Sequence, residues 1–321
     1  MYLFSFHKSR KNAELIKLSL KIIFFSLYLS ASSNTKVYAS GAPFNGLKEY
    51  AKGVSIGIET PASSGSGFVI GKKNNEYFFL TAGHVAFSDP QKEEYWVYSF
   101  AKGISKKYRV NKFIKPEAFK GKDIVIGSFS SEEKLGIVPI FPLGEKLWLT
   151  FEENPEKKYF TFQIVDSFNF RGFDYDWSIQ GSPIVAGISI PTKAITVPIF
   201  RYSIASMQSR AIGNQNGYEA IYSATSTVPG MSGGGVFGAR VCPKFEYIYS
   251  EEKWLGVYPG VFAMHGMSEE YNQSGSRSGT SLGIPLSLFT EFFYENSSKF
   301  GIPNGIDYFN LIYHLCVNRR M

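Results

Sequence analysis

Residues 66–84 of the chain have the sequence SGFVIGKKNNEYFFLTAGH. Two short apolar runs, 68–70 and 77–80, are separated by Lys-Lys-Asn-Asn at 72–75. Short apolar runs joined by a polar, asparagine-rich turn are typical of a β-hairpin. The stretch therefore predicts two antiparallel strands, the second of which leads directly into Ala82-Gly83-His84.

The same strand pattern continues on both sides of this hairpin. We expect further strands at 53–58, 95–100, 108–113 and 123–129. Together with the hairpin they are enough for one small closed barrel that ends near Pro139. A second set of strands without intervening helical periodicity predicts a second barrel. This set comprises 146–151, 159–165, 182–190, 199–205, 219–223, 235–237 and 256–264.

The composition supports an all-β fold. Of the 321 residues, 17% are aromatic and 19% are charged, which is typical of a well-packed globular protein and not of a disordered one. The 31 glycines and 15 prolines are spread along the chain and indicate many turns between short strands. The one helix that we expect spans 284–293, where apolar residues recur at helical spacing, and the segment 296–321 gives no prediction.

The first 39 residues have the pattern of a cleaved signal peptide. A basic leader precedes an apolar run at 22–29, and Val37-Tyr38-Ala39 matches a cleavage site, with the cut expected after Ala39. The alternative is a transmembrane anchor, but the run is shorter than the roughly 20 residues that a span needs. We therefore expect a secreted or periplasmic protein with no stable membrane association after cleavage.

Charge and cysteine content limit the partners. Without residues 1–39 the chain keeps 28 basic and 26 acidic residues, a net charge of +2, so we expect no nucleic-acid partner. Cys242 and Cys316 could form one disulfide in an oxidising compartment, and the sequence leaves this open. CxxC and HExxH patterns are absent from the sequence, and we expect neither a metal site nor a cofactor.

Three segments carry residues suited to nucleophilic catalysis. Pro229–Gly235 places Ser232 among glycines, where its hydroxyl is accessible and backbone N–H groups can converge on an oxyanion. His84 follows an apolar strand and can serve as a base near neutral pH. Asp123 leads into another apolar strand and, if buried beside the histidine, would set its tautomer.

Together these segments resemble a known family. Thr81–His84, Asp123–Val125 and Gly230–Gly234, in this order, are similar to the three signature blocks of trypsin-like serine peptidases. The resemblance is closest to secreted bacterial and cyanobacterial-type members and covers roughly residues 53–293. Two positions depart from the family pattern: Gly235 replaces a usual proline, and Met231 replaces the aspartate of animal enzymes.

The resemblance implies an architecture and a site. The fold would be all-β, with two six-stranded antiparallel barrels of the chymotrypsin type, at 40–139 and 140–293, and a C-terminal helix before a tail at 294–321. The implied catalytic residues are His84, Asp123 and Ser232, with the N–H groups of Gly230 and Ser232 as the oxyanion hole. The implied function is hydrolysis of peptide bonds in protein or peptide substrates.

The implied substrate pocket favours an acidic residue before the scissile bond. Thr227 and His265 occupy segments that flank this pocket in the family, and His265 resembles the histidine of bacterial glutamyl endopeptidases. Both side chains can donate a hydrogen bond to a carboxylate. The alternative is a histidine bonded to backbone and a preference for small apolar residues.

Two other functions compete with a trypsin-like peptidase. Residues 230–234 also match G-x-S-x-G of α/β-hydrolase esterases, with His265 or His314 as the later histidine. That fold needs a helix directly after the serine, and the three glycines at 233–235 are poor helix formers. The second competitor is a binding module that kept the barrels and lost activity.

Overall fold

The structure is a computed structural model. It describes residues 46–60, 63–100, 105–141, 143, 160–161, 183–190, 197–205, 210–215, 217–224, 227–241, 245–246, 257–268 and 280–317. The chain divides into two units, Met1–Tyr38 and Ala39–Met321, and every described residue belongs to the second unit. The expected signal peptide, the strand expected at 146–151, Cys242 and the side chain of Cys316 lie outside the described residues.

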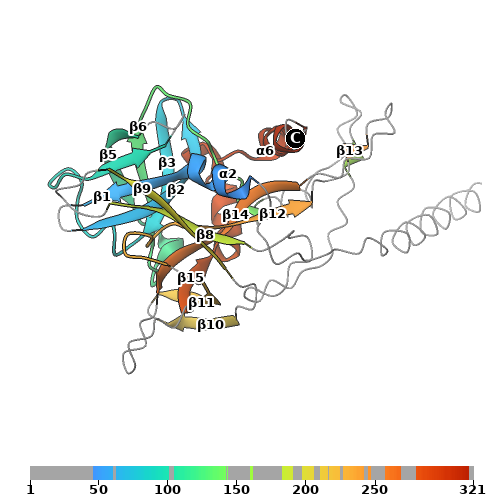
Figure 1. The fold of residues 1–321 in the computed structure, drawn as a ribbon. Helices are drawn as coiled ribbons and strands as arrows, with labels where there is room; N and C mark the ends of the chain where they lie inside the picture. Colours follow the sequence, from blue (N-terminus) through green and yellow to red (C-terminus); the bar gives the residue numbers. More distant parts are fainter. Residues whose placement is uncertain are drawn as a thin grey trace, which may run out of the picture. The chain divides into compact units, whose positions relative to one another are not determined.

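The first strands form a closed antiparallel barrel, which confirms the first predicted barrel (Figure 1). Its strands lie in the order β1-β2-β3-β6-β5-β4. Their bounds are β1 (Ser55–Glu59), β2 (Ser64–Lys73), β3 (Glu76–Ala82), β4 (Trp96–Ser99), β5 (Lys106–Ile114) and β6 (Ile124–Ser130). A short 3₁₀ helix, η2 (Glu117–Phe119), connects β5 to β6.

The predicted hairpin of residues 66–84 is β2 and β3. The turn between them contains Asn74, whose φ of 56° is the left-handed conformation that asparagine tolerates better than most residues. In β3 the run from Tyr77 to Leu80 is buried without alternation. One face of this strand points into the barrel, and on the other Phe78 packs edge-on against Phe300 at 5.4 Å between ring centroids. A strand that is covered on both faces does not need polar residues at alternate positions, so its sequence is continuously apolar.

The later strands form a seven-stranded sheet in the order β10-β11-β15-β14-β12-β8-β9. Its strands are β8 (Ile184–Ser189), β9 (Ile199–Ile204), β10 (Arg210–Gln215), β11 (Tyr218–Ser223), β12 (Gly235–Val241), β14 (Val257–Ser268) and β15 (Thr280–Pro285). The strands β7 (Phe160–Thr161) and β13 (Phe245–Glu246) pair with each other. The described part of the chain is thus all-β in its main elements, and closure of the second sheet into a barrel stays a prediction.

Two predicted boundaries were wrong. The strand expected at 53–58 begins only at Ser55, because Gly53 and Val54 end the helix α2 (Leu47–Val54). The buried residues of α2 recur at helical spacing, which covers one apolar face against the core. The helix expected at 284–293 begins only at Leu286, because Ile284 pairs with Met264 in the sheet.

The C-terminal segment is helical. It contains η3 (Leu286–Phe289), α4 (Thr290–Glu295), α5 (Ser297–Phe300) and α6 (Gly305–Val317). The last two lie in the segment 296–321, whose residue pattern allowed no prediction. Among the helices that the structure describes, none combines the length and the apolar character needed to cross a bilayer.

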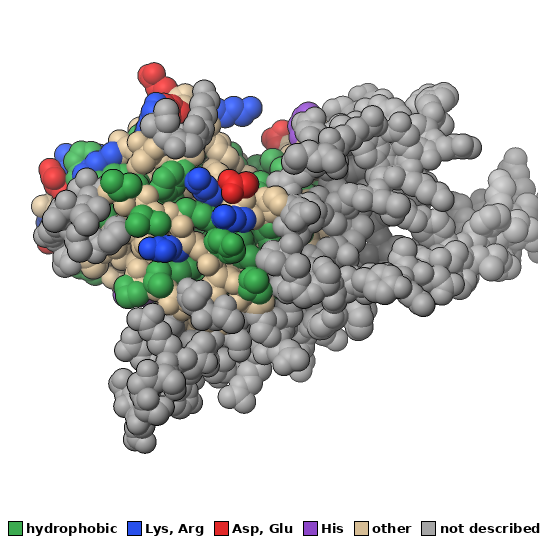
Figure 2. Space-filling model, in the orientation of Figure 1, with side chains coloured by type: hydrophobic (Ala, Val, Ile, Leu, Met, Phe, Trp, Pro, Cys, Tyr) green, Lys and Arg blue, Asp and Glu red, His purple; other side chains and the backbone are tan. Residues whose placement is uncertain are grey.

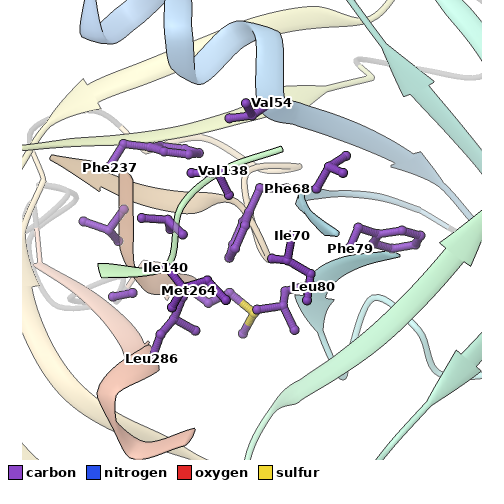
Figure 3. Close-up of a cluster of buried hydrophobic side chains, with 14 of the residues drawn as sticks. Val54, Phe68, Ile70, Phe79, Leu80, Val138, Ile140, Phe237, Met264 and Leu286 are labelled. Atoms are coloured by element: carbon purple, nitrogen blue, oxygen red, sulfur yellow. The ribbon is translucent and has the colours of Figure 1, made fainter. Parts of the chain in front are cut away.

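One hydrophobic core joins the barrel to the second sheet (Figure 3). Phe68 and Leu80 of the barrel point into the same cluster as Phe237 and Met264 of the sheet, and Phe68 packs edge-on against Phe237 at 6.1 Å between ring centroids. The connecting segment also contributes, since Ile140 is buried and bridges to Val261 of β14. This shared core holds the end of β3 close to the turn before β12.

On the face shown in Figure 2, the lysine and arginine side chains of the described residues are scattered among hydrophobic and uncharged ones. They do not gather into a single basic patch on this face.

Candidate active site

His84 and Asp123 are brought together by the barrel. His84 lies in the turn directly after β3, and Asp123 directly precedes β6, which pairs with β3. The His84 Nδ1 atom lies 2.6 Å from Asp123 Oδ2, and the His84 backbone N–H donates to Oδ1 at 2.8 Å. Gly83 permits this approach, because a Cβ there would lie 2.8 Å from Oδ1.

The environment keeps Asp123 ionised. Burial alone would raise the pKa of this carboxyl group, but hydrogen bonds from His84 and Tyr218 outweigh it and hold the pKa below its ordinary value. The side chain of Asp123 is 16% exposed, whereas that of His84 is 42% exposed. The pair thus presents an imidazole to solvent, with an anionic carboxylate behind it.

A tight turn precedes Ser232. The Met231 N–H donates to the Val228 carbonyl at 3.1 Å, so residues 228–231 form a β-turn. Pro229 occupies its second position, and Gly230, with φ of 91°, occupies its third. This is the residue pattern of a type II turn, whose third position requires a positive φ.

The turn leaves two N–H groups unused. Within the described residues, the N–H groups of Gly230 and Ser232 have no hydrogen-bond acceptor, whereas those of Met231, Gly233 and Gly234 all have one. Buried or half-buried backbone donors are normally paired. The N–H groups of Gly230 and of Ser232 itself are therefore available to donate hydrogen bonds to a ligand oxygen.

Ser66 of β2 holds this loop in place. Its hydroxyl donates to the Gly230 carbonyl at 2.5 Å, and its backbone N–H donates to the Ser232 carbonyl at 2.7 Å. The Ile188 N–H donates to the same hydroxyl at 2.8 Å. The carbonyls on both sides of Met231 are thereby anchored to the barrel.

The loop also lies against the end of β3. A Cβ on Gly233 would meet the backbone nitrogen of Ala82 at 2.7 Å, two residues before His84. In the described part of the chain, no hydrogen bond joins the Ser232 hydroxyl to His84. Catalytic hydrogen bonds are often long in ligand-free enzymes and shorten when substrate binds.

Tyr218, a residue that the sequence did not single out, contacts Asp123. Its hydroxyl donates to Oδ2, the oxygen that also bonds His84. Gly217 beside it accepts a hydrogen bond from the Asp123 N–H at 3.2 Å. The only sequence signal for this contact was an aromatic residue at the start of a strand, which is common in any sheet.

His265 lies against the Ser232 loop, and Thr227 directly precedes this loop in the sequence. The backbone of His265 bonds Gly233 and Gly234, each at 2.7 Å. Burial, together with a smaller effect of the nearby His84, lowers the pKa of the His265 imidazole to about 3, so the ring is neutral at neutral pH. Thr227 is half-buried. Their role as a substrate pocket stays a prediction.

A cavity of about 450 Å³ lies beside Asp123. Gly83, Asp123 and Gly217 form its inner side, and Phe113, Lys115 and Lys122 are among its other lining residues. Thr227 and His265 do not line it, so this cavity is distinct from the predicted substrate pocket. Within the described residues, no group of three or more His, Cys, Asp or Glu side chains is arranged to hold a metal ion.

No protein-family model and no curated protein sequence matches this chain. Among solved structures, the chain is similar to the apo MamO protease domain from Magnetospirillum magneticum, with 10% identity, a TM-score of 0.41, and 76% of this chain and 97% of that chain covered. It is also similar to the Rv3671c protease in an inactive form, with 12% identity, a TM-score of 0.40, and coverage of 79% and 96%. The inactive form of a serine-to-alanine mutant of Rv3671c from M. tuberculosis H37Rv gives 12% identity, a TM-score of 0.40, and coverage of 80% and 95%. These neighbours are protease domains, but similarity this low carries no weight for fold or activity.

Proposed function

We propose that this chain is a trypsin-like serine endopeptidase. The observation that supports it best is the pairing of His84 with a half-buried carboxylate beside a serine loop that has two free N–H groups. An imidazole held by a carboxylate is a base, and two converging N–H groups can stabilise a developing oxyanion. On this proposal the second sheet closes into the other barrel.

The proposed reaction follows from these positions. The Ser232 hydroxyl transfers its proton to His84 as its oxygen bonds the scissile carbonyl carbon. The carbonyl oxygen becomes an oxyanion that accepts hydrogen bonds from the N–H groups of Gly230 and Ser232. His84 then protonates the leaving amine, the acyl-enzyme forms, and water hydrolyses it by the same steps. Asp123 keeps His84 in the required tautomer and stabilises the imidazolium.

Labelling with a fluorophosphonate tests this function. We expect modification at Ser232 alone, and a fall in peptidase activity of several orders of magnitude in Ser232→Ala and His84→Ala. Ser130 provides the matched control, because it is an exposed serine at the end of β6 that is farther from Asp123. Ser130→Ala should keep full activity. Labelling at another serine, or full activity of Ser232→Ala, would contradict the proposal.

The narrower form of the proposal is a preference for glutamate before the scissile bond. Neutral His265 can donate one hydrogen bond to a carboxylate, and Thr227 offers a hydroxyl. Peptides that differ only at this residue test the preference. Equal cleavage after Glu, Ala and Leu, unchanged in His265→Gln, would remove the preference and leave the peptidase.

We also propose export, with the leader cleaved after Ala39. Amino-terminal sequencing of the exported protein should begin at Ser40. A protein retained in the cytoplasm with an intact leader would contradict export.

The alternative function is a binding module that has lost activity. Such a module would keep the fold and the pairing of His84 with Asp123 without an activated serine. Under this alternative, fluorophosphonate does not label Ser232 although the protein is folded.

A further inference from the structure

We propose that Tyr218 is a positioning residue that holds Asp123 in the orientation needed to act on His84, and that Gly266 leaves the space for it. This inference rests on the proposed peptidase function. It adds a residue from the second sheet to a pair that otherwise belongs entirely to the barrel.

The contact between Tyr218 and Asp123 is half-buried and involves both the side chain and the backbone of the aspartate. Tyr218 is 2% exposed, and its hydroxyl donates to Oδ2 of Asp123. The neighbouring Gly217 accepts a hydrogen bond from the Asp123 backbone at 3.2 Å. The start of β11 therefore contacts both the side chain and the backbone of the aspartate.

Gly266 makes this position possible. It lies in β14, which is separated from β11 by β15 in the sheet. A Cβ on Gly266 would lie 1.9 Å from Cε1 of the Tyr218 ring and 2.6 Å from Cδ1. The ring occupies the space that any side chain at 266 would take.

The electrostatics suit a permanent donor. Burial raises the pKa of the Tyr218 hydroxyl well above its ordinary value, and its bond to Asp123 raises it further. At neutral pH Tyr218 is thus protonated while Asp123 is ionised. Among the described residues, the charged or titratable groups near this pair include His84, His265, Lys115 and the ion pair between Lys122 and Glu219.

Two donors share one oxygen, and this sets the expected effect of removing one of them. The Tyr218 hydroxyl withdraws negative charge from Oδ2, which also accepts from His84 Nδ1. Without it, the carboxylate loses one of the hydrogen bonds that fix its orientation, so its bond to His84 Nδ1 should be less well ordered and turnover should fall.

The proton between His84 Nδ1 and Asp123 tests this directly. We compare the full-length chain carrying Ser232→Ala with the same chain carrying Tyr218→Phe as well, and follow the signal of this ring proton by NMR. The signal is identified by its loss in His84→Gln. We expect it to broaden or disappear in Tyr218→Phe, because the carboxylate is no longer held in one orientation. A signal of unchanged position and width would overturn the proposal. Because this readout needs no turnover, it is separate from a failure of the peptidase function.

A second experiment tests the role of Gly266 in active protein. Gly266→Ala alone should lower kcat/KM by about 100-fold, whereas in Tyr218→Ala it should add less than about twofold, because the ring that it displaces is gone. Independent, multiplying effects would overturn the coupling.

Gly260→Ala is the matched control. It lies in the same strand, and its Cβ would meet the Phe141 ring at 2.3 Å. It should destabilise the fold without changing the signal of the His84 Nδ1 proton. A change as large as that in Tyr218→Phe would show that any packing defect in β14 suffices, and would overturn the specific role of Tyr218.

Discussion

The hydroxyl of Ser66 and the carbonyl of Gly230 are 164 residues apart in the sequence and form a hydrogen bond of 2.5 Å. Ser66 is fully buried, and Gly187 leaves room for it, since a Cβ there would lie 2.5 Å from its hydroxyl oxygen. A single serine of the barrel thus holds the turn that exposes the two free N–H groups.

Ser66→Ala should therefore impair turnover more than binding. We expect kcat for a peptide substrate to fall by about 10- to 100-fold with little change in KM, because the misplaced N–H groups act mainly in the transition state. Ser128→Ala is the matched control, a buried serine whose hydroxyl bonds Glu76 at 2.7 Å in the other part of the barrel. Equal kinetic losses in both variants would indicate a general loss of stability.

Replacing Gly233 and Gly53 by alanine should change the free energy of unfolding in opposite directions. Gly233 has φ of 85°, and its Cβ would lie 2.3 Å from the Ser66 carbonyl oxygen, so Gly233→Ala should cost about 3 kcal/mol or more and abolish activity. Gly53 lies in α2 with nothing within 4 Å of its added Cβ, so Gly53→Ala should stabilise by about 0.5–1 kcal/mol. Urea unfolding measures both changes in the free energy of unfolding. A tolerated Gly233→Ala would contradict the loop geometry.

His265 should make the fold sensitive to acid. Its pKa is about 3 in the folded chain and 6.5 for an ordinary histidine, so the unfolded chain binds an extra proton between these values. The stability of the protein should therefore be lost as the pH falls from about 6.5 toward 3. Thermal unfolding at a series of pH values should show a shallower loss for His265→Gln than for the original chain. Identical slopes would mean that other groups dominate acid unfolding.

The C-terminal helix α6 should contribute to the core. Ile312 is fully buried, and the Tyr308 hydroxyl donates to the Ile140 carbonyl at 3.1 Å. Ile312→Ala should cost about 2–5 kcal/mol and Tyr308→Phe about 1 kcal/mol, measured by denaturant unfolding. The exposed Asn310 provides the control, since Asn310→Ala should change little. Equal effects of Ile312→Ala and Asn310→Ala would contradict the packing of α6.

The local patterns of the sequence predicted much of the architecture. The strands of the first barrel could be predicted because each is a short apolar run between turn residues, and such a run favours a β-strand by its local sequence alone. His84 and Asp123 were assigned a common role, and they lie in contact. The roles of Ser232, Gly230, Thr227 and His265 stay predictions.

Element boundaries were less predictable. Gly53-Val54 continues an alternating pattern and was assigned to a strand, but α2 buries Val54 as the last residue of its apolar face. Ile284 fits helical spacing, but its pairing with Met264 places it in the sheet. In both cases neighbours distant in the sequence decided between two conformations that the local pattern allowed.

The sequence by itself determined the all-β class, the first barrel, and the residue types able to perform nucleophilic catalysis. Only the tertiary structure identified Ser66, Tyr218 and Gly266 as their supports. Each of these acts through a partner far along the chain: Tyr218 lies 95 residues from Asp123 and Ser66 164 residues from Gly230. Hydrogen bonds and ring contacts act over a few ångströms, so such a role exists only once folding has brought the partners together.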